Sequence, residues 1–290
     1  MKKDINFYSE GQKIAGNLYF PDNYQEGNKY PGIILCHGFA GIKEVLLPPY
    51  AESFAKAGFI ALVFDYRGFG DSEGDRGRLI PQEQVTDIRN AITYLQSLPE
   101  IEPEKLGLWG TSFGGANAIY TSAADKRVQA VAVQLTFGNG ERVIKQPLSP
   151  EDSDKLDQTT RKVWERLVNK NKDLKLSPDQ ILTDEDSKIF YQDIIKKYPE
   201  IQTKISLTTL RHTMEYKPEE VITSVNKPVL IIAAEHDAAC PLEESKMLYD
   251  KANEPKLFHL LKGAKHYDTY TGEFFKESCG QAVQWFKERL

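Results

Sequence analysis

A serine lies between two glycines in the segment Gly110-Thr111-Ser112-Phe113-Gly114, which fits the pattern G-x-S-x-G. The apolar run Leu106–Trp109 comes directly before it, and a segment that can begin a helix follows from Gly115. Between a strand and a helix, such a serine is held in a strained turn that exposes its hydroxyl, and the glycines leave room for the turn. The five residues alone could also be a plain glycine-rich helix start. The flanking strand and helix favour Ser112 as a nucleophile.

A serine hydroxyl is a weak nucleophile unless a base takes its proton and a third group orients that base. When the nucleophile follows a strand in this way, the acid and then the histidine come later in the chain. Asp237 follows the apolar run Val229–Ala234, and His266 follows the next run, Leu257–Leu261. Functional groups gather at the carboxyl ends of parallel strands, so we expect both residues to face Ser112. The sequence thus predicts nucleophilic catalysis by Ser112, Asp237 and His266.

Other residues could fill these two roles. Glu235 is a second acid, although it lies nearer the preceding strand, and Asp237 could instead cap a helix or a turn. His266 could be an ordinary histidine of a surface loop. The remaining histidines fit less well. His259 lies within a strand, and His236 lies next to the acid. His37 comes before the nucleophile in the chain, and His212 lies in the middle of the chain.

Attack on an acyl group leaves negative charge on its oxygen, which needs positioned hydrogen-bond donors. The backbone N–H of Phe113, directly after the nucleophile, is expected to be one donor. The segment His37-Gly38-Phe39-Ala40-Gly41 follows the apolar run Gly32–Cys36, and the backbone N–H of Phe39 is expected to be the other. The Phe39 side chain would then line the acyl pocket. The alternative is that residues 37–41 form only a glycine-containing turn.

The glycine-rich segment Asp65–Gly74 superficially resembles a dinucleotide-binding loop. It lacks a correct G-x-G-x-x-G spacing, and its carboxylates would repel a pyrophosphate. We therefore expect a structural loop that supports the site, and no cofactor. The three cysteines, Cys36, Cys240 and Cys279, have no spacing typical of a zinc site or a disulfide framework, so no metal is expected. Cys36 and Cys240 flank the predicted site.

Short apolar runs separated by helical segments must position these residues. Runs of this kind suit strands that are buried on both faces of a parallel sheet; they are Gly32–Cys36, Phe59–Phe64, Leu106–Trp109, Val128–Leu135, Val229–Ala234 and Leu257–Leu261. A hairpin that turns at Ser9–Gln12 precedes them, one helix is predicted from Pro81, and a last one ends at Leu290. The alternation predicts an α/β fold with a mostly parallel sheet flanked by helices.

One long stretch breaks this alternation, because no buried strand is evident from about Gly138 to Val225. Residues 160–168, 187–197 and 207–216 are predicted to be helical, and aromatic residues such as Trp164 and Tyr216 argue against a disordered linker. We interpret residues 138–225 as a helical cap (lid) inserted into a core of residues 1–137 and 226–290. A detached domain is the alternative.

The composition is that of an ordinary globular protein, with 40% hydrophobic residues, 27% charged residues and a net charge of −5. A mildly acidic chain lacks the excess of basic residues that is typical of proteins that bind nucleic acid or an anionic membrane. No window could span a bilayer, and no apolar segment typical of a signal peptide follows Lys2 and Lys3, so a cytoplasmic location is expected. The oligomeric state stays open, a homodimer included.

Together these segments resemble the α/β-hydrolase superfamily over nearly the whole chain, and most closely its dienelactone hydrolase-like and X-Pro dipeptidyl-peptidase-like members. The matching segments are Phe7–Gly11, Pro31–Glu44, Phe64–Gly74, Gly110–Gly115, Glu235–Pro241 and Gly263–His266. The resemblance implies a sheet of about eight strands with the second antiparallel, and an active site between core and cap. It also supports the triad and the two oxyanion donors named above.

The chain departs from these relatives in two ways that concern the substrate. True dienelactone hydrolases have a cysteine where this chain has Ser112, and the large peptidase relatives carry further domains for which 290 residues leave no room, so neither activity is expected. Some fungal relatives with a similar cap resemble acyl- or polyketide transferases.

The sequence therefore predicts a serine hydrolase that cleaves a small-molecule carboxylic ester, or a related acyl bond, through an acyl-enzyme on Ser112. An acyltransferase or a carbon–carbon bond hydrolase with the same triad is the main alternative. A non-enzymatic binding scaffold is a further one, which the presence of all three residues in the expected order disfavours.

Overall fold

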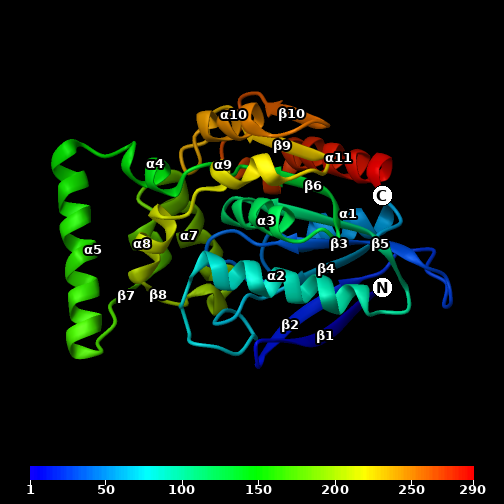
Figure 1. Cartoon of the computed structure of the whole chain (residues 1–290), viewed down its shortest axis with the longest axis horizontal. Coiled ribbons are helices and arrows are strands. Elements are labelled where there is room, and N and C mark those ends of the chain that lie inside the picture. The colour runs from blue at the N-terminus through cyan, green and yellow to red at the C-terminus, as the bar shows by residue number, and fades with distance from the viewer.

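The computed structural model describes residues 1–290 and is built around one eight-stranded sheet (Figure 1). The strand order is β1-β2-β4-β3-β5-β6-β9-β10. β2 is antiparallel to both of its neighbours, and every other adjacent pair is parallel. The strands are β1 (Lys2–Ser9), β2 (Gln12–Tyr19), β3 (Tyr30–Cys36), β4 (Ile60–Phe64), β5 (Ile101–Thr111), β6 (Val128–Gln134), β9 (Val229–Ala234) and β10 (Lys256–Leu261). The predicted mostly parallel sheet with a reversed second strand is confirmed.

The central strands are the apolar runs of the sequence. All residues of β4 and β9 are buried, which is the pattern of strands covered on both faces. β1 alternates exposed and buried residues, and its hairpin to β2 turns at Glu10 and Gly11, whose φ values are 48° and 84°. Two successive positive φ values match the twist of a tight hairpin. β5 begins earlier than predicted, because Ile101 pairs with Tyr30 before a shift in register.

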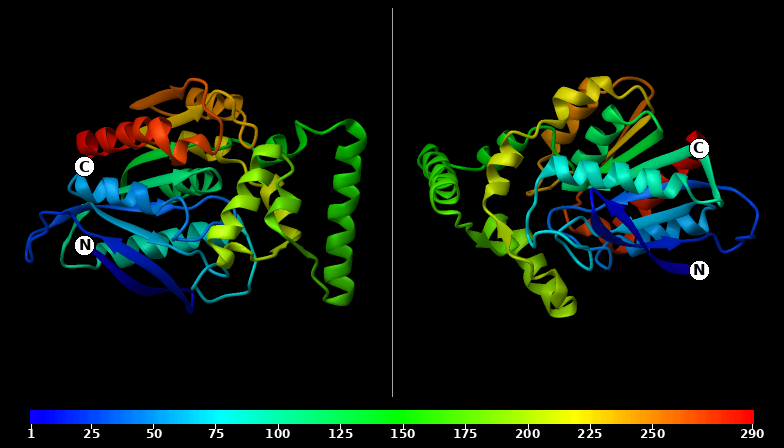
Figure 2. Two further views of the ribbon diagram at one scale, coloured as in Figure 1. Left: turned by 180° about the vertical axis from the view of Figure 1, so that it is seen from behind. Right: turned by 60° about the horizontal axis from the view of Figure 1, so that its bottom comes forward.

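Helices cover both faces of the sheet (Figure 2). α1 (Pro48–Lys56) and α11 (Gly272–Arg289) lie on one face, where Tyr50, Trp109 and Phe286 belong to one buried cluster. α2 (Pro81–Gln96), α3 (Phe113–Ala124) and α10 (Leu242–Lys251) contribute to the cluster on the other face. α2 begins at Pro81, as predicted.

The chain between β6 and β9 forms a group of mostly short helices at one end of the sheet (Figures 1 and 2). Its elements are α4 (Gly140–Lys145), α5 (Pro150–Lys170), β7 (Lys175–Leu176), α6 (Pro178–Ile181), α7 (Glu185–Lys197), η1 (Pro199–Ile201), β8 (Ile205–Ser206), α8 (Thr208–Met214), α9 (Pro218–Val221) and η2 (Ile222–Ser224). The three helices predicted in this stretch correspond to α5, α7 and α8. α5 lies at the outer edge and packs against α8, whereas α9 and η2 pack against α3 of the core.

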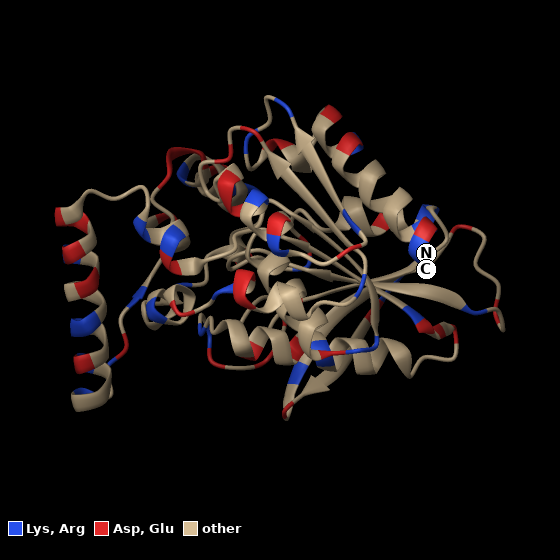
Figure 3. Cartoon of the chain, turned by 45° about the horizontal axis from the view of Figure 1, so that its top comes forward, with Lys and Arg blue, Asp and Glu red and all other residues tan.

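Charged residues of both signs lie on the outer helices and loops, and few lie on the strands (Figure 3). None of the helices combines the length and apolar character needed to cross a bilayer. The three cysteines are buried and unpaired. No three or more His, Cys, Asp or Glu side chains come together in a way that could hold a metal ion.

Candidate active site

Ser112 lies in the turn between β5 and α3. Its φ of 54° and ψ of −125° are a conformation that a residue with a side chain adopts only under strain. The Ser112 N–H donates to the Gln134 carbonyl at 2.9 Å, and the Ser112 carbonyl accepts from the Gly115 N–H at 3.0 Å, so β6 and α3 hold the turn. A side chain at Gly110 or Gly114 would collide with adjacent backbone atoms. The two glycines are therefore required by space as well as by the turn.

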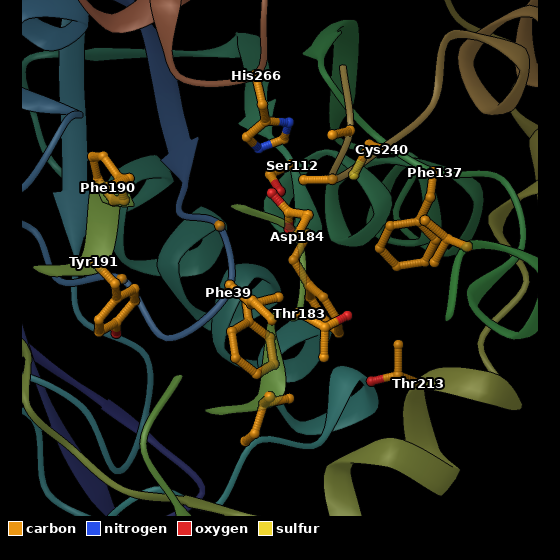
Figure 4. A pocket seen from close by; sticks show the side chains of 18 of the residues that line it. Phe39, Ser112, Phe137, Thr183, Asp184, Phe190, Tyr191, Thr213, Cys240 and His266 are labelled. Carbon is orange, nitrogen blue, oxygen red and sulfur yellow. The ribbon is translucent and has the colours of Figure 1, made fainter. Parts of the chain in front are cut away.

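His266 and Asp237 meet beyond the carboxyl ends of the neighbouring strands β9 and β10. His266 Nδ1 lies 2.7 Å from Asp237 Oδ2, and both side chains are buried. Asp237 Oδ1 accepts hydrogen bonds from the backbone N–H groups of Ala239 at 2.9 Å and Cys240 at 2.7 Å, which fix the carboxylate. In Figure 4 the His266 ring lies above Ser112 with one ring nitrogen turned toward it. Because Asp237 holds Nδ1, Nε2 is left to face the serine.

The electrostatics of His266 suit a proton acceptor. Burial lowers the pKa of His266, but the charge of Asp237 and its hydrogen bond raise it, and Asp184 and Asp186 act in the same direction. The net pKa of His266 lies above the ordinary value of a histidine. The site therefore stabilises the imidazolium that forms when His266 takes a proton.

The other acid and the other histidines considered for the triad have different partners. Glu235 Oε2 accepts a hydrogen bond from the Gly263 N–H at 2.7 Å, whereas the hydrogen bond to His266 comes from Asp237. The other histidines each have different surroundings: His236 is exposed, His259 pairs with Glu277 at 2.8 Å, His37 bonds the Val45 carbonyl, and His212 lies against the Trp164 ring. Of the two acids considered, Asp237 is the one brought to His266.

The two predicted oxyanion donors lie beside the nucleophile. Phe39 and Phe113 both line the cavity at Ser112, with their rings 6.1 Å apart. Phe113 begins α3, so its N–H has no acceptor within the helix. The Phe39 N–H donates no hydrogen bond within the chain. A Cβ at Gly38 would lie 3.3 Å from Ser112 Cβ, so this loop passes directly against the nucleophile. Both amides are thus available to an oxygen bound there.

The Asp65–Gly74 segment supports the loop that carries Phe39, as predicted. Asp65 is fully buried, and its Oδ1 accepts from the Lys43 N–H at 2.7 Å. Its Oδ2 accepts from Lys43 Nζ and from the Asp71 N–H, both at 2.9 Å. This carboxylate therefore ties the two loops together.

A chain of buried hydrogen bonds lies under the nucleophile turn. Thr111 Oγ1 lies 2.6 Å from the Tyr270 hydroxyl and accepts from Gln134 Nε2 at 3.3 Å. The Tyr50 hydroxyl is 3.2 Å from Gln134 Oε1 and 2.7 Å from Ser278 Oγ. The chain links the residue before Ser112 to η3 (Asp268–Tyr270), which follows His266. No signal in the sequence predicted these partners, because they are brought together from distant segments.

A cavity of about 450 Å³ lies over Ser112, between the sheet and the segment that joins β6 to β9. Of its 30 lining residues, 20 are hydrophobic. Those from the joining segment include Val143, Leu148, Leu156, Ile181, Phe190 and Tyr191. Cys240 lines the cavity, whereas Cys36 is buried in β3 and does not. Asp184 also lines it. No signal in the sequence indicated this residue, because its surroundings in the sequence are those of an ordinary helix cap.

The sequence matches the family described as serine aminopeptidase, S33, over residues 29–269. The chain belongs to this family of α/β-hydrolases. The resemblance that the motifs indicated is thereby confirmed at the level of the superfamily.

Similar proteins cover nearly the whole of this α/β-hydrolase. A 31.7 kDa protein of Escherichia coli from the traX-finO intergenic region is 40% identical over 280 residues, which are 96% of this chain and 98% of that protein. Thiohydrolase aneE of Aspergillus aculeatus is 27% identical over 97% of this chain and 91% of that protein. Polyketide transferase grgF of a Penicillium species is also 27% identical, over 94% of this chain and 92% of that protein. The structure of DcsB in complex with its substrate analogue has a TM-score of 0.87 and 27% identity, and each chain covers all of the other.

Proposed function

We propose that this α/β-hydrolase cleaves a carboxylic ester, or a related acyl bond such as a thioester, through an acyl-enzyme on Ser112. The observation that carries the proposal is the buried His266–Asp237 pair, 2.7 Å apart, beside a serine on a strained turn. The relatives named thiohydrolase and polyketide transferase support acyl chemistry of this kind.

The proposed reaction has two halves. Ser112 Oγ attacks the substrate carbonyl while its proton passes to His266 Nε2, and the N–H groups of Phe39 and Phe113 bind the oxygen that becomes negative. The tetrahedral intermediate collapses, and His266 gives its proton to the departing alcohol or thiol. Water then attacks the acyl group with His266 as base, which releases the acid and restores Ser112. Asp237 keeps the imidazole oriented and stabilises its charged form.

The cavity supports a substrate with a largely apolar acyl or alcohol part. Its walls are mostly hydrophobic, and many of the wall residues come from the segment between β6 and β9. In this proposal residues 138–225 act as a cap that covers the acyl group. A pocket of about 450 Å³ suits a small molecule rather than a folded protein.

An acyltransferase with the same triad is the second candidate. The polyketide transferase among the relatives and the apolar cavity favour it, because an acceptor that replaces water needs a site with little water. Incubating the acyl-enzyme with alcohols and thiols, and measuring the ratio of transfer product to free acid, separates the two activities.

The proposal is tested by steady-state turnover of short- and medium-chain aryl esters and thioesters. Ser112→Ala and His266→Ala should each lower kcat by about 10³-fold or more. The double variant should lose little beyond the single ones, since the residues act as a unit. His236→Ala is the matched control, because this exposed histidine adjoins Asp237 in the chain but its ion-pair partner is Glu235. Undiminished turnover by folded Ser112→Ala protein would refute the proposal.

A further inference from the structure

One carboxylate faces the proposed catalytic residues from the segment between β6 and β9. Asp184 precedes α7 and lines the cavity that also contains Ser112 and His266. Figure 4 shows the Asp184 side chain extending toward Ser112. After the larger effects of burial and of Asp237, the charges of Asp184 and Asp186 both contribute to the raised pKa of His266, but of these two only Asp184 lines the cavity.

The Asp184 carboxylate has no cationic partner in the chain. Its Oδ1 accepts a hydrogen bond from the Ser187 N–H at 2.8 Å and so caps α7, and no Lys or Arg forms an ion pair with it. The nearby Asp186 differs, because its carboxylate is paired with Lys265 at 3.0 Å and does not line the cavity. The negative charge of Asp184 therefore remains uncompensated.

When His266 is neutral, no side chain that lines the cavity carries a positive charge that could bind an anion. No Lys, Arg or Glu lines it, and 20 of its 30 lining residues are hydrophobic. Charges interact strongly across apolar surroundings, and an ion that leaves water without finding a partner loses its hydration energy. A substrate carboxylate or phosphate would lose its hydration and also be repelled by Asp184. A protonated amine would be attracted to the same carboxylate.

We propose that Asp184 is a specificity-determining residue that excludes acyl substrates with a carboxylate or phosphate near the scissile bond and favours uncharged or amine-bearing ones. The inference rests on the proposed function, since it concerns the substrate of the same serine. It defines the charge class of that substrate, which the fold and the triad leave open. A repulsive element of this kind is a common means of discrimination between similar ligands.

Three aryl esters of matched acyl length test the inference: one uncharged, one ending in an ammonium and one ending in a carboxylate. For the unmodified protein, kcat/KM should fall in the order ammonium, uncharged, carboxylate. Asp184→Asn should reduce the ratio between the ammonium and carboxylate esters by roughly 10- to 100-fold, as expected for removal of one nearby charge. Asn can still accept the Ser187 hydrogen bond, so the start of α7 is preserved.

Asp186→Asn is the matched control, because it removes the same charge two residues away, outside the cavity. It should leave the ratio unchanged to within about twofold. An unchanged ratio in folded Asp184→Asn protein that still turns over the uncharged ester would overturn the inference and leave the proposed function intact. If the unmodified protein turns over none of the esters, the proposed function fails instead. The three acyl groups are then compared as amides by calorimetric binding, where an absent charge preference overturns the inference by itself.

Discussion

At the scale of single residues, Ser112, His266 and Asp237 each have a position that suits one step of an acyl transfer. Ser112 holds a strained backbone conformation, and Asp237 is fixed by two backbone N–H groups while it holds His266 Nδ1. A base of this kind must be neutral to accept the serine proton. Because the pKa of His266 is raised, the neutral form is lost at a higher pH than in an ordinary histidine.

The pH dependence of kcat/KM tests this arrangement. The acid limb of the native profile should lie above about pH 6.5, the ordinary pKa of histidine. Asp237→Asn removes the charge that raises the pKa of His266, so burial should then dominate and shift the acid limb to lower pH. The same variant should lower kcat by about 10⁴-fold, since the histidine loses the partner that fixes its tautomer. An acid limb that stays in place would show that another group is the base.

At the scale of elements, the strand ends and the loops after them bring the site together, and most of this was predictable. The apolar runs identified the central strands, and the G-x-S-x-G segment identified the turn between β5 and α3. The support beneath that turn was not predictable. Thr111 and Tyr270 are 159 positions apart, and neither lies in a pattern that indicates a partner. Such contacts depend on how the sheet places η3 against β5.

Removal of this support should loosen the nucleophile turn. Tyr270→Phe leaves the buried Thr111 hydroxyl without its 2.6 Å partner, and we expect a loss of about 1–2 kcal/mol in the free energy of unfolding. Turnover should fall as well, because the residue next to Ser112 is less firmly held. Urea unfolding of Tyr270→Phe, Thr111→Val and the double variant measures the coupling between the two residues. Strictly additive losses would show that the hydroxyl pair contributes no mutual stabilisation.

At the scale of the whole molecule, the strands of the sheet were easier to predict than the details of the segment between β6 and β9. α5 begins at Pro150, although its apolar spacing indicates a helix only from residue 160. The start signals were present, since Ser149 caps the helix and Glu151 and Asp152 follow. β7 and β8 have two residues each, which is too short for any periodicity. The role of Asp184 depends on tertiary placement alone.

Stability toward acid is a property of the whole molecule to which His37 contributes. Burial lowers the pKa of His37 to about 4, while hydrogen bonds to the backbone partly oppose this. In the unfolded chain His37 takes a proton below about pH 6.5, but in the fold it stays neutral to a lower pH. The free energy of unfolding therefore falls as the pH falls from about 6.5 toward 4. His266 acts in the opposite sense, because its raised pKa gives stability that is lost as the pH rises through that pKa.

Comparing native protein with His37→Gln isolates this effect, because the contribution of His266 is common to both. Between pH 7.5 and 5, the native protein should lose about 2 kcal/mol more of its free energy of unfolding than the variant. Urea unfolding at the two pH values measures the difference. Equal losses in the two proteins would contradict a buried, neutral His37.

The central claim is that Ser112 is a nucleophile activated by His266, and a fluorophosphonate tests it most directly. The native protein is treated with the probe, and the adduct is located by mass spectrometry of its peptides. The structure predicts a single adduct on Ser112 that is absent in Ser112→Ala and forms at least about 10³-fold more slowly in His266→Ala. An unmodified Ser112, or labelling that does not depend on His266, would contradict the claim.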